Sequence, residues 1–260
     1  PGQYDAGMPG MTRDFFNGRP FRRLRPTDYT MDIFDKINDS RFFKTFQTVY
    51  YRNVASNTGL PVFTAGNAPT PALVGKLRVG LGDSAAVFIV NPANMPILTS
   101  QLAAMRYYAV YARNKQTTVG GPITTDFSNN KYLAMWKFND PIRLTTTSNE
   151  ARGIRNGTLA RLGETYLIIA EAYGRKGDYT TALNYVNILR RRAAYKASEE
   201  RSPQIWQFMG GPNTLANTEA PNLATQALFD NNTPGEYYPV SASTTQSRFI
   251  HFILNERTRE

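Results

Sequence analysis

The stretch from Leu159 to Ala194 constrains the fold more than any other part of the chain, because it carries two helical patterns on either side of one glycine. In its first half, apolar residues recur at alternating steps of three and four, which stacks them on one helix face: Leu159, Leu162, Tyr166, Ile169 and Tyr173. In its second half, another apolar face is formed by Tyr179, Ala182, Leu183, Val186 and Leu189.

The residues between the two patterns favour a tight turn. Gly177 is suited to end the first helix, since glycine enters the left-handed conformation at little cost. Asp178 is suited to cap the second helix, because its carboxylate accepts bonds from free backbone N–H groups. We therefore expect an antiparallel helical hairpin over residues 155–176 and 178–196, with Ala170 and Ala182 near the helix contact.

This hairpin resembles one unit of the tetratricopeptide (TPR) repeat. The run from Ala170 to Val186 has a small residue, a tyrosine, the Gly-Asp-Tyr turn, a second alanine and another tyrosine at the spacing of that repeat. A repeat array needs roughly three units to bury a continuous core. Because we find one clear copy, the hairpin must pack on other helices of this chain or on residues outside it.

Four segments of the chain share a second resemblance. The first contains Asn-Asp-Ser-Arg-Phe, the second reads Leu-Gly-Asp-Ser-Ala, the third includes Lys-Phe-Asn-Asp-Pro shortly before the helix from Arg161 to Ala172, and the last ends in Glu-Arg-Thr-Arg-Glu: residues 18–51, 81–91, 131–143 and 253–260. In this order they resemble the C-terminal half of the SusD/RagB family, which are outer-membrane nutrient-binding lipoproteins.

The resemblance implies a mainly α fold, with a TPR-like helical hairpin scaffold, extensive irregular loops and minor β structure, as in SusD-like proteins. It also implies non-enzymatic capture of a nutrient, a glycan or a peptide, at the cell surface in partnership with a SusC-like TonB-dependent transporter. The alternative is a generic TPR scaffold for protein–protein interaction. The single repeat and the long loops argue against that alternative.

On this interpretation, residues 1–260 are the C-terminal region of such a protein, with the hairpin at 155–196 and a loop-rich capping portion at 53–150. The sequence has no signal peptide and no cysteine for lipidation, and its last family motif is only the opening of a helix. We therefore expect a fragment without the family's N-terminal half and extreme C-terminus, held to the membrane only through a lipid anchor that lies outside it.

The net charge of +10 raises the question of a nucleic-acid partner. The basic residues are scattered, however: Arg22, Arg23 and Arg25 form one group, and Arg190 to Arg192 fan around the end of a helix. Cations are favoured at that end by the helix dipole, so we expect a solvated helix end and no nucleic-acid partner. The absence of cysteine excludes disulfides and thiolate chemistry.

Little in the sequence indicates catalysis, a cofactor or a metal. His251 is the only histidine, and its neighbours Phe249 and Phe252 favour a packing role. Asp32 and Asp35 fit a solvated acidic face, and Gly80–Asp83 fits a turn. We expect Asp39 and Asp140 to be structural, because an Asn-Asp pair at an element boundary typically caps or turns the chain.

Aromatic residues in loops are the candidate ligand-binding residues, because the C–H faces of sugars pack on aromatic rings. The candidates are Trp136, Trp206, Tyr237 and Tyr238. Glycine and proline around Trp206 and the Tyr237–Tyr238 pair predict that these three are exposed. Trp136 is expected to be buried, since Leu133, Met135 and Phe138 flank it. Helical spacing commits Tyr166, Tyr173 and Tyr185 to packing.

Elsewhere we expect a short helix from Thr27 or Asp28 to Ile37 and a helix or extended piece at 40–52. A strand is expected from Ala86 to Val90, a helix from Pro96 to about residue 113, a short helix from Leu223 to Phe229 and a last helix opening at Ser247.

Overall fold

The computed structural model describes residues 8–14, 24–137, 139–145, 147, 150, 152–197, 199, 201, 203–212, 214, 216–231, 233 and 235–260. Phe138, Arg22 and Arg23 lie outside these residues. Helix makes up 32% and strand 13%, which confirms a mixed fold with more helix than strand. The chain forms two compact units, and each takes residues from several parts of the sequence. Unit 1 comprises residues 1–26, 45–155 and 202–211, and unit 2 comprises 27–44, 156–201 and 212–260.

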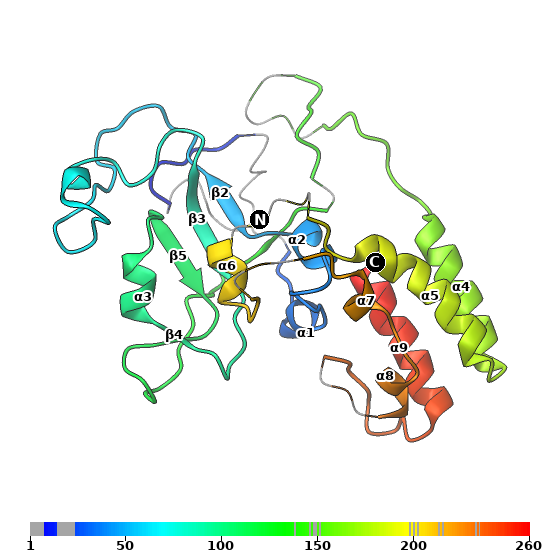
Figure 1. Ribbon diagram of the computed structural model, residues 1–260. Helices are drawn as coiled ribbons and strands as arrows, with labels where there is room; N and C mark the ends of the chain where they lie inside the picture. The colour runs from blue at the N-terminus through cyan, green and yellow to red at the C-terminus, as the bar shows by residue number, and fades with distance from the viewer. Residues whose placement is uncertain are drawn as a thin grey trace. The chain divides into compact units, whose positions relative to one another are not determined.

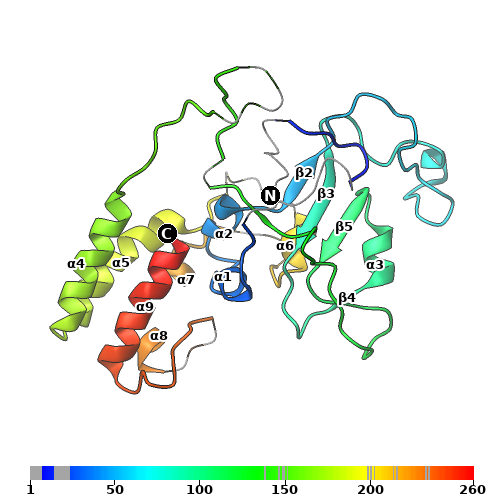
Figure 2. The ribbon, with the colours of Figure 1, turned by 180° about the vertical axis from the view of Figure 1, so that it is seen from behind.

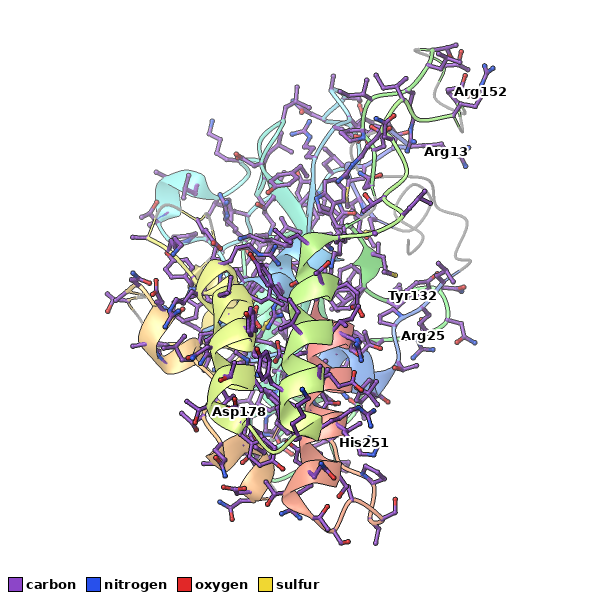
Figure 3. All side chains as sticks on the ribbon, turned by 90° about the vertical axis from the view of Figure 1, so that its right-hand side faces the viewer. Arg13, Arg25, Tyr132, Arg152, Asp178 and His251 are labelled. Carbon is purple, nitrogen blue, oxygen red and sulfur yellow. The ribbon has the colours of Figure 1, made fainter. Side chains whose placement is uncertain are left out.

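Unit 2 contains the expected hairpin. Helix α4 (Leu162–Arg175) and helix α5 (Tyr179–Ala193) lie side by side, and α9 (Thr245–Arg259) packs along α4 (Figures 1 and 2). Gly177 has a φ of 81° in the turn, and the Asp178 carboxylate accepts a hydrogen bond from the backbone N–H of Thr181 at 3.0 Å. Figure 3 shows Asp178 at the tip of the hairpin. The antiparallel pair of helices and both turn residues are confirmed, but the first helix begins at Leu162 and not at residue 155, and the second ends at Ala193 and not at residue 196. The TPR assignment stays a prediction.

The packed face of α4 differs from the one expected. Its buried residues are Gly163, Leu167, Ala170 and Gly174, whereas Leu159 precedes the helix fully exposed and Leu162 and Tyr173 remain exposed on it. The cause is α9, which approaches the face where α4 has small side chains. Ala170 and Ala182 are both buried in one core, as expected.

That core also receives residues from α9, from the short helix α8 (Ala227–Asp230) and from Ala224, which follows the short helix α7 (Glu219–Asn222). Its largest members are the rings of Phe229, Phe249 and Phe252, which contact one another. Helix α9 begins two residues before the expected Ser247. Thr244 caps it, and the side chains of Thr244 and Ser247 bond each other's backbone N–H groups.

The N-terminal part of unit 2 begins with α1 (Asp28–Asp32), whose start at Asp28 confirms the expectation. The Thr27 hydroxyl caps it by accepting a bond from the Thr30 N–H at 3.2 Å. The helix ends well before Ile37. Helix α2 (Arg41–Thr45) follows across the boundary between the two units.

Unit 1 is built around β3 (Ser84–Ile89), which lies between β2 (Val49–Tyr51) and β5 (Ala109–Ala112) (Figure 1). β2 pairs with β3 antiparallel and β5 pairs with it parallel. Residues 85–90 are buried, so the apolar run is a core strand, as expected. Two further pairs are β1 (Phe46–Gln47) with β7 (Ala134–Met135) and β4 (Ile97–Leu98) with β6 (Lys115–Gln116).

The helix expected from Pro96 to residue 113 is wrong for most of its length. Helix α3 covers only Thr99–Ala104, and the chain then enters strand β5. The residues from Tyr107 to Tyr111 are rich in aromatic and β-branched side chains, and pairing with β3 decides their conformation. Residues 53–82 are loop-rich as expected, with η1 (Pro71–Leu73) as their helical turn. A short helix α6 (Pro203–Gln207) contacts β3.

The close contact between α4 and α9 gives a test of this packing. An alanine Cβ at Gly174 would overlap the ring of Phe249. We expect Gly174→Ala to lower the free energy of unfolding by about 1–3 kcal/mol, although glycine-to-alanine changes in open helix positions stabilise by up to about 1 kcal/mol. Denaturant titration measures the change.

Gly157→Ala is the matched control, because nothing lies within 4 Å of its added Cβ. That variant should stay within about 0.5 kcal/mol of wild type. Equal stability of the two variants would contradict the α4–α9 contact.

Candidate functional site

The centre of unit 2 is a fully buried carboxylate, that of Glu256 on α9. Arg190 of α5 bonds its Oε1 through Nε at 3.0 Å, and Arg259 bonds the same oxygen through Nη1 at 2.7 Å. Arg41 of α2 reaches Oε2 at 3.2 Å. Burial raises the pKa of Glu256, but the guanidinium groups of Arg190, Arg41 and Arg259 outweigh it and hold that pKa well below its ordinary value. The carboxylate is therefore ionised in the core.

Two more carboxylates accept hydrogen bonds from these arginines. Asp39 accepts a bond from Nη2 of Arg41 at 2.6 Å, and Glu236 accepts one from Nη2 of Arg259 at 2.7 Å. Glu236 also lies 3.4 Å from Nη2 of Arg190. A fourth acid, Glu260, lies 3.7 Å from Arg41 and also pairs with Arg161 and Arg192, so each arginine of the network has an acid beside it.

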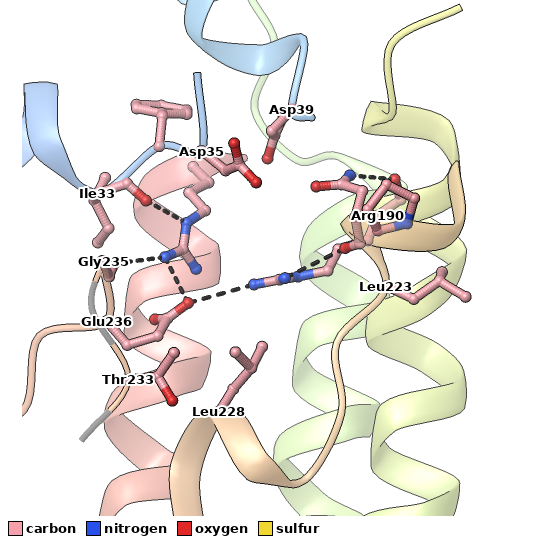
Figure 4. A pocket seen from close by; sticks show the side chains of 13 residues that line it. Ile33, Asp35, Asp39, Arg190, Leu223, Leu228, Thr233, Gly235 and Glu236 are labelled. Carbon is pink, nitrogen blue, oxygen red and sulfur yellow. Dashed lines mark hydrogen bonds and ion pairs between the residues drawn. The ribbon is translucent and has the colours of Figure 1, made fainter. Parts of the chain in front are cut away.

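A cavity of about 350 Å³ opens beside this network (Figure 4). Arg190, Glu236 and Arg259 form part of its wall, and Figure 4 shows Arg190 and Glu236 joined across it. The rest of the wall mixes polar groups with apolar side chains: Ile33, Phe34, Asp35, Asp39, Pro221, Asn222, Leu223, Leu228, Thr233 and Gly235. Such a wall offers hydrogen-bond donors and acceptors together with apolar contact area. The positive charges of its two arginines are compensated by the acids paired with them.

An exposed aromatic pair adjoins the segments that line the cavity. Tyr237 follows Gly235 and Glu236, and Tyr29 lies in α1, which leads into Ile33 and Phe34. The two rings meet edge to face with centroids 5.2 Å apart, and 37% of Tyr29 and 43% of Tyr237 is exposed.

Buried Asn255 of α9 fixes this pair to the wall of the cavity. Its Oδ1 accepts a bond from the Tyr29 hydroxyl at 2.9 Å. Its Nδ2 donates to Glu236 at 2.9 Å and to the Tyr237 carbonyl at 3.3 Å. One side chain therefore positions both rings and an acid of the cavity wall.

Of the four aromatic residues expected to bind ligand, Tyr237 is exposed as predicted, whereas the exposure expected for Trp206 and Tyr238 is wrong. Trp206 is only 3% exposed, because Gly211 has no Cβ and its backbone lies against the indole ring. Tyr238 is half-buried against the core, and its hydroxyl donates to the Leu228 carbonyl at 2.6 Å. Burial, and then the charge of Glu236, raises the pKa of that hydroxyl.

Trp136, in unit 1, was expected to be buried but is only half-buried. Its backbone N–H donates to the Thr45 carbonyl at 2.7 Å. Tyr29 was missed by the sequence analysis. The only sequence signal for Tyr29 is its position in the first turn of a short capped helix. Whether any of these residues binds ligand stays a prediction.

The expectation of a solvated helix end at Arg190 to Arg192 is wrong for one of the three. Arg191 and Arg192 are exposed, but Arg190 is buried in the ionic network. Helical rotation turns Arg190 towards α9, where the carboxylate of Glu256 compensates its burial.

The acidic residues considered as alternatives serve local structure. Asp140 accepts bonds from the N–H groups of Ile142, Ile154 and Arg155, and the bond from Arg155 is the main cause of its lowered pKa. Asp35 accepts bonds from the N–H groups of Ile37 and Asn38. His251 is half-buried on α9 (Figure 3).

The residues that the structure describes include no cluster typical of a metal site and no helix suited to span a membrane. No group of three or more metal-ligating side chains of the usual kinds comes together in this part of the chain. None of its helices combines the length and the apolar character that crossing a membrane requires.

Comparison with known protein families matches residues 10–260 to the model described as the SusD family. The chain belongs to the SusD family. No curated protein and no solved structure matches it. Membership agrees with the resemblance carried by the four sequence segments, two of which supply Asp39, Arg41, Glu256 and Arg259 to the ionic network. SusD proteins are surface lipoproteins of the outer membrane, and they bind nutrients, glycans among them.

The ionic network of this SusD-family chain predicts an acid-sensitive fold. Glu256→Gln leaves three buried arginines without their shared acid, so we expect a loss of about 3–5 kcal/mol in the free energy of unfolding at neutral pH. Because the pKa of Glu256 is lowered in the folded state, its contribution is present above the ordinary value of 4.5 and fades as the pH falls below it. Wild type should therefore lose more stability than Glu256→Gln between about pH 5 and pH 3.

Glu164→Gln is the control, because Glu164 is exposed and pairs with Arg257 at the surface. It should cost less than about 1 kcal/mol and keep the wild-type pH dependence. An acid profile of Glu256→Gln as steep as that of wild type would mean that Glu256 is not the titrating group.

Proposed function

We propose that this chain captures a neutral, hydroxyl-rich nutrient, a glycan, at the cell surface without transforming it. The observation that carries the proposal is the exposed Tyr29–Tyr237 pair held next to a cavity whose arginines are neutralised by acids. Tyrosine rings pack against the C–H faces of sugars, and the mixed wall supplies partners for hydroxyl groups. Membership of the SusD family supports the same role.

The absence of turnover is part of the proposal. A general acid needs a carboxyl group whose pKa lies near the operating pH. The most buried carboxylate here has the opposite property, because three guanidinium groups lower the pKa of Glu256. The remaining acids of the network, Asp39 and Glu236, are each bonded to an arginine, an arrangement that holds charges in place.

We expect Tyr29→Ala and Tyr237→Ala each to weaken glycan binding at least about tenfold, which corresponds to the 1.4 kcal/mol that one lost ring stack contributes. A panel of neutral gluco-, galacto- and manno-oligosaccharides, screened by affinity electrophoresis and measured by calorimetry, identifies the ligand and the change. The bound oligosaccharide should be recovered uncleaved after prolonged incubation.

Tyr173→Ala is the matched control, since Tyr173 has an exposure of 37%, equal to that of Tyr29, but lies on α4. It should leave glycan affinity unchanged. Affinity that is retained in both site variants would rule out this aromatic pair as the binding surface. A set of peptides is screened in parallel with the oligosaccharides. Binding of a peptide together with no binding of any oligosaccharide would rule out a glycan as the ligand.

We further propose that the outer face of the hairpin contacts a protein partner, a SusC-like TonB-dependent transporter, and that the full-length protein is lipid-anchored. Leu162 is 66% exposed on this face, and Tyr173 stacks on Tyr185 with centroids 6.1 Å apart. An exposed apolar strip of this kind favours a protein contact. The same strip is the observation that favours the alternative, a generic TPR interaction scaffold.

A charge placed on the strip tests the partner. We expect Leu162→Glu in the full-length protein to lose the transporter in affinity purification from its own cells, while glycan affinity is retained. Ile154→Glu is the control, because Ile154 is a similarly exposed apolar residue that belongs to unit 1 and not to the hairpin. If wild type instead recovers proteins other than a transporter, and Leu162→Glu loses them, the generic interaction scaffold would be favoured.

A further inference from the structure

The side chains that line the unit 2 cavity have already committed their hydrogen-bond donors to the protein. Every guanidinium nitrogen of Arg190 and of Arg259 donates to a carbonyl or carboxylate oxygen of unit 2. The Thr233 hydroxyl donates to the Ala227 carbonyl at 3.2 Å, and Nδ2 of Asn222 donates to the Arg190 carbonyl at 2.7 Å. Among the described residues of the lining, these four are the ones whose side chains carry N–H or O–H groups.

One acceptor of the lining has no partner, the amide oxygen of Asn222. This residue is only 3% exposed, and its Nδ2 and its backbone carbonyl are both bonded to Arg190, which fixes the direction of the side chain. None of the described residues donates a hydrogen bond to Oδ1. This oxygen is not among the unpartnered side-chain atoms that burial closes to solvent, such as Oε1 of Gln47. The open space that Asn222 lines is the cavity, so Oδ1 is available to a donor that enters it.

A second acceptor is the exposed carboxylate of Asp35, which lines the same cavity (Figure 4). Its Oδ2 accepts one bond, from Nδ2 of Asn38 at 2.7 Å. A carboxylate oxygen accepts about two bonds, so Oδ2 retains an acceptor site. No lysine or arginine of the described residues forms an ion pair with Asp35, whereas Asp39 and Glu236 each pair with an arginine. The cavity therefore combines available acceptors with side-chain donors that are already in use.

We propose that Asn222 Oδ1 and the Asp35 carboxylate accept hydrogen bonds from two hydroxyl groups of one sugar residue bound in the cavity. A volume of about 350 Å³ lies at the lower end of the roughly 300–1,000 Å³ typical of ligand pockets, which suits a single residue of a longer chain. Leu223 and Leu228 offer apolar contact to the C–H groups of its ring. Meeting the buried acceptor of Asn222 removes the cost of leaving it unpaired.

This inference rests on the proposed glycan capture, because it names the groups of the sugar that the cavity recognises. In an unmodified neutral hexose, the hydroxyl groups are the hydrogen-bond donors, whereas the ring and glycosidic oxygens only accept. An O-methyl or O-acetyl group removes a donor, and a sugar carboxylate brings negative charge towards Asp35. The cavity therefore favours sugars whose hydroxyl groups are free.

The experiment measures binding by ligand-observed NMR titration with the methyl glycosides of glucose, galactose and mannose and with their monofluorinated derivatives. Each derivative replaces one hydroxyl group by fluorine, which is of similar size but cannot donate a hydrogen bond. Asp35→Asn keeps an oxygen for the N–H groups of Ile37 and Asn38 and replaces the other acceptor by a donor. Asn222→Leu removes Oδ1 at nearly constant shape.

Asp32→Asn is the matched control. It makes the same change at the end of α1, at an acid outside the described lining of the cavity that pairs with Lys36 at 4.0 Å. It should alter neither the affinity for the parent hexosides nor the effect of fluorine by more than about twofold.

We expect two fluorine positions of the best-bound hexoside to weaken binding to wild type about fivefold or more, because each leaves one acceptor of the wall unmet. Asp35→Asn should weaken the parent hexoside to a similar extent and should abolish one of the two fluorine effects. Asn222→Leu should abolish the other. If one variant fails to fold, the other decides by the same comparison.

Binding of a parent hexoside that no fluorine position weakens overturns the inference and leaves the proposed glycan capture standing. Both fluorine effects persisting in Asp35→Asn or in Asn222→Leu overturns it as well, as does the absence of saturable binding by every parent hexoside. The proposed function fails by a separate readout, the oligosaccharide panel measured on wild type and on the Tyr29 and Tyr237 variants.

Discussion

The fold of unit 2 depends on the burial of one carboxylate, that of Glu256. Removing a carboxylate from water costs several kcal/mol, and the cost is offset only when cationic partners are held close to it. Those partners come from α2, α5 and α9, segments that are far apart in the sequence. The network also orders the part of the unit that carries the two exposed tyrosines, because Arg259 holds Glu236, and Glu236 shares Asn255 with both of them.

The arginines of the unit 2 cavity are compensated by acids, and this limits the kind of molecule that the cavity favours. In unit 2 every guanidinium of the network has an acid beside it, so an additional anion would meet carboxylates that repel it. A neutral molecule with hydroxyl groups meets no such barrier.

Signals that act within a few residues were predictable from the sequence. Gly177, Asp178 and Thr27 end or begin helices because of their own conformational and hydrogen-bonding properties, which neighbours far along the chain do not alter. The packed face of α4 was not predictable in this way. Tyr166 and Tyr173 are larger than Gly163 and Gly174, and hydrophobic spacing alone favours the larger side chains. The approach of α9 reverses that preference, because a helix can come close only where the side chains are small.

The candidate site has the same limit, because exposure is a property of tertiary packing. Glycine next to Trp206 suggested an open loop, yet the missing Cβ of Gly211 is what allows the chain to cover that ring. Tyr237 is held at the surface, because Asn255 donates a hydrogen bond to its backbone carbonyl and its ring lies against that of Tyr29. Two rings that are fixed before the ligand arrives lose little conformational freedom on binding, so more of the stacking energy is retained as affinity. That preorganisation suits the nutrient capture proposed for this SusD-family chain.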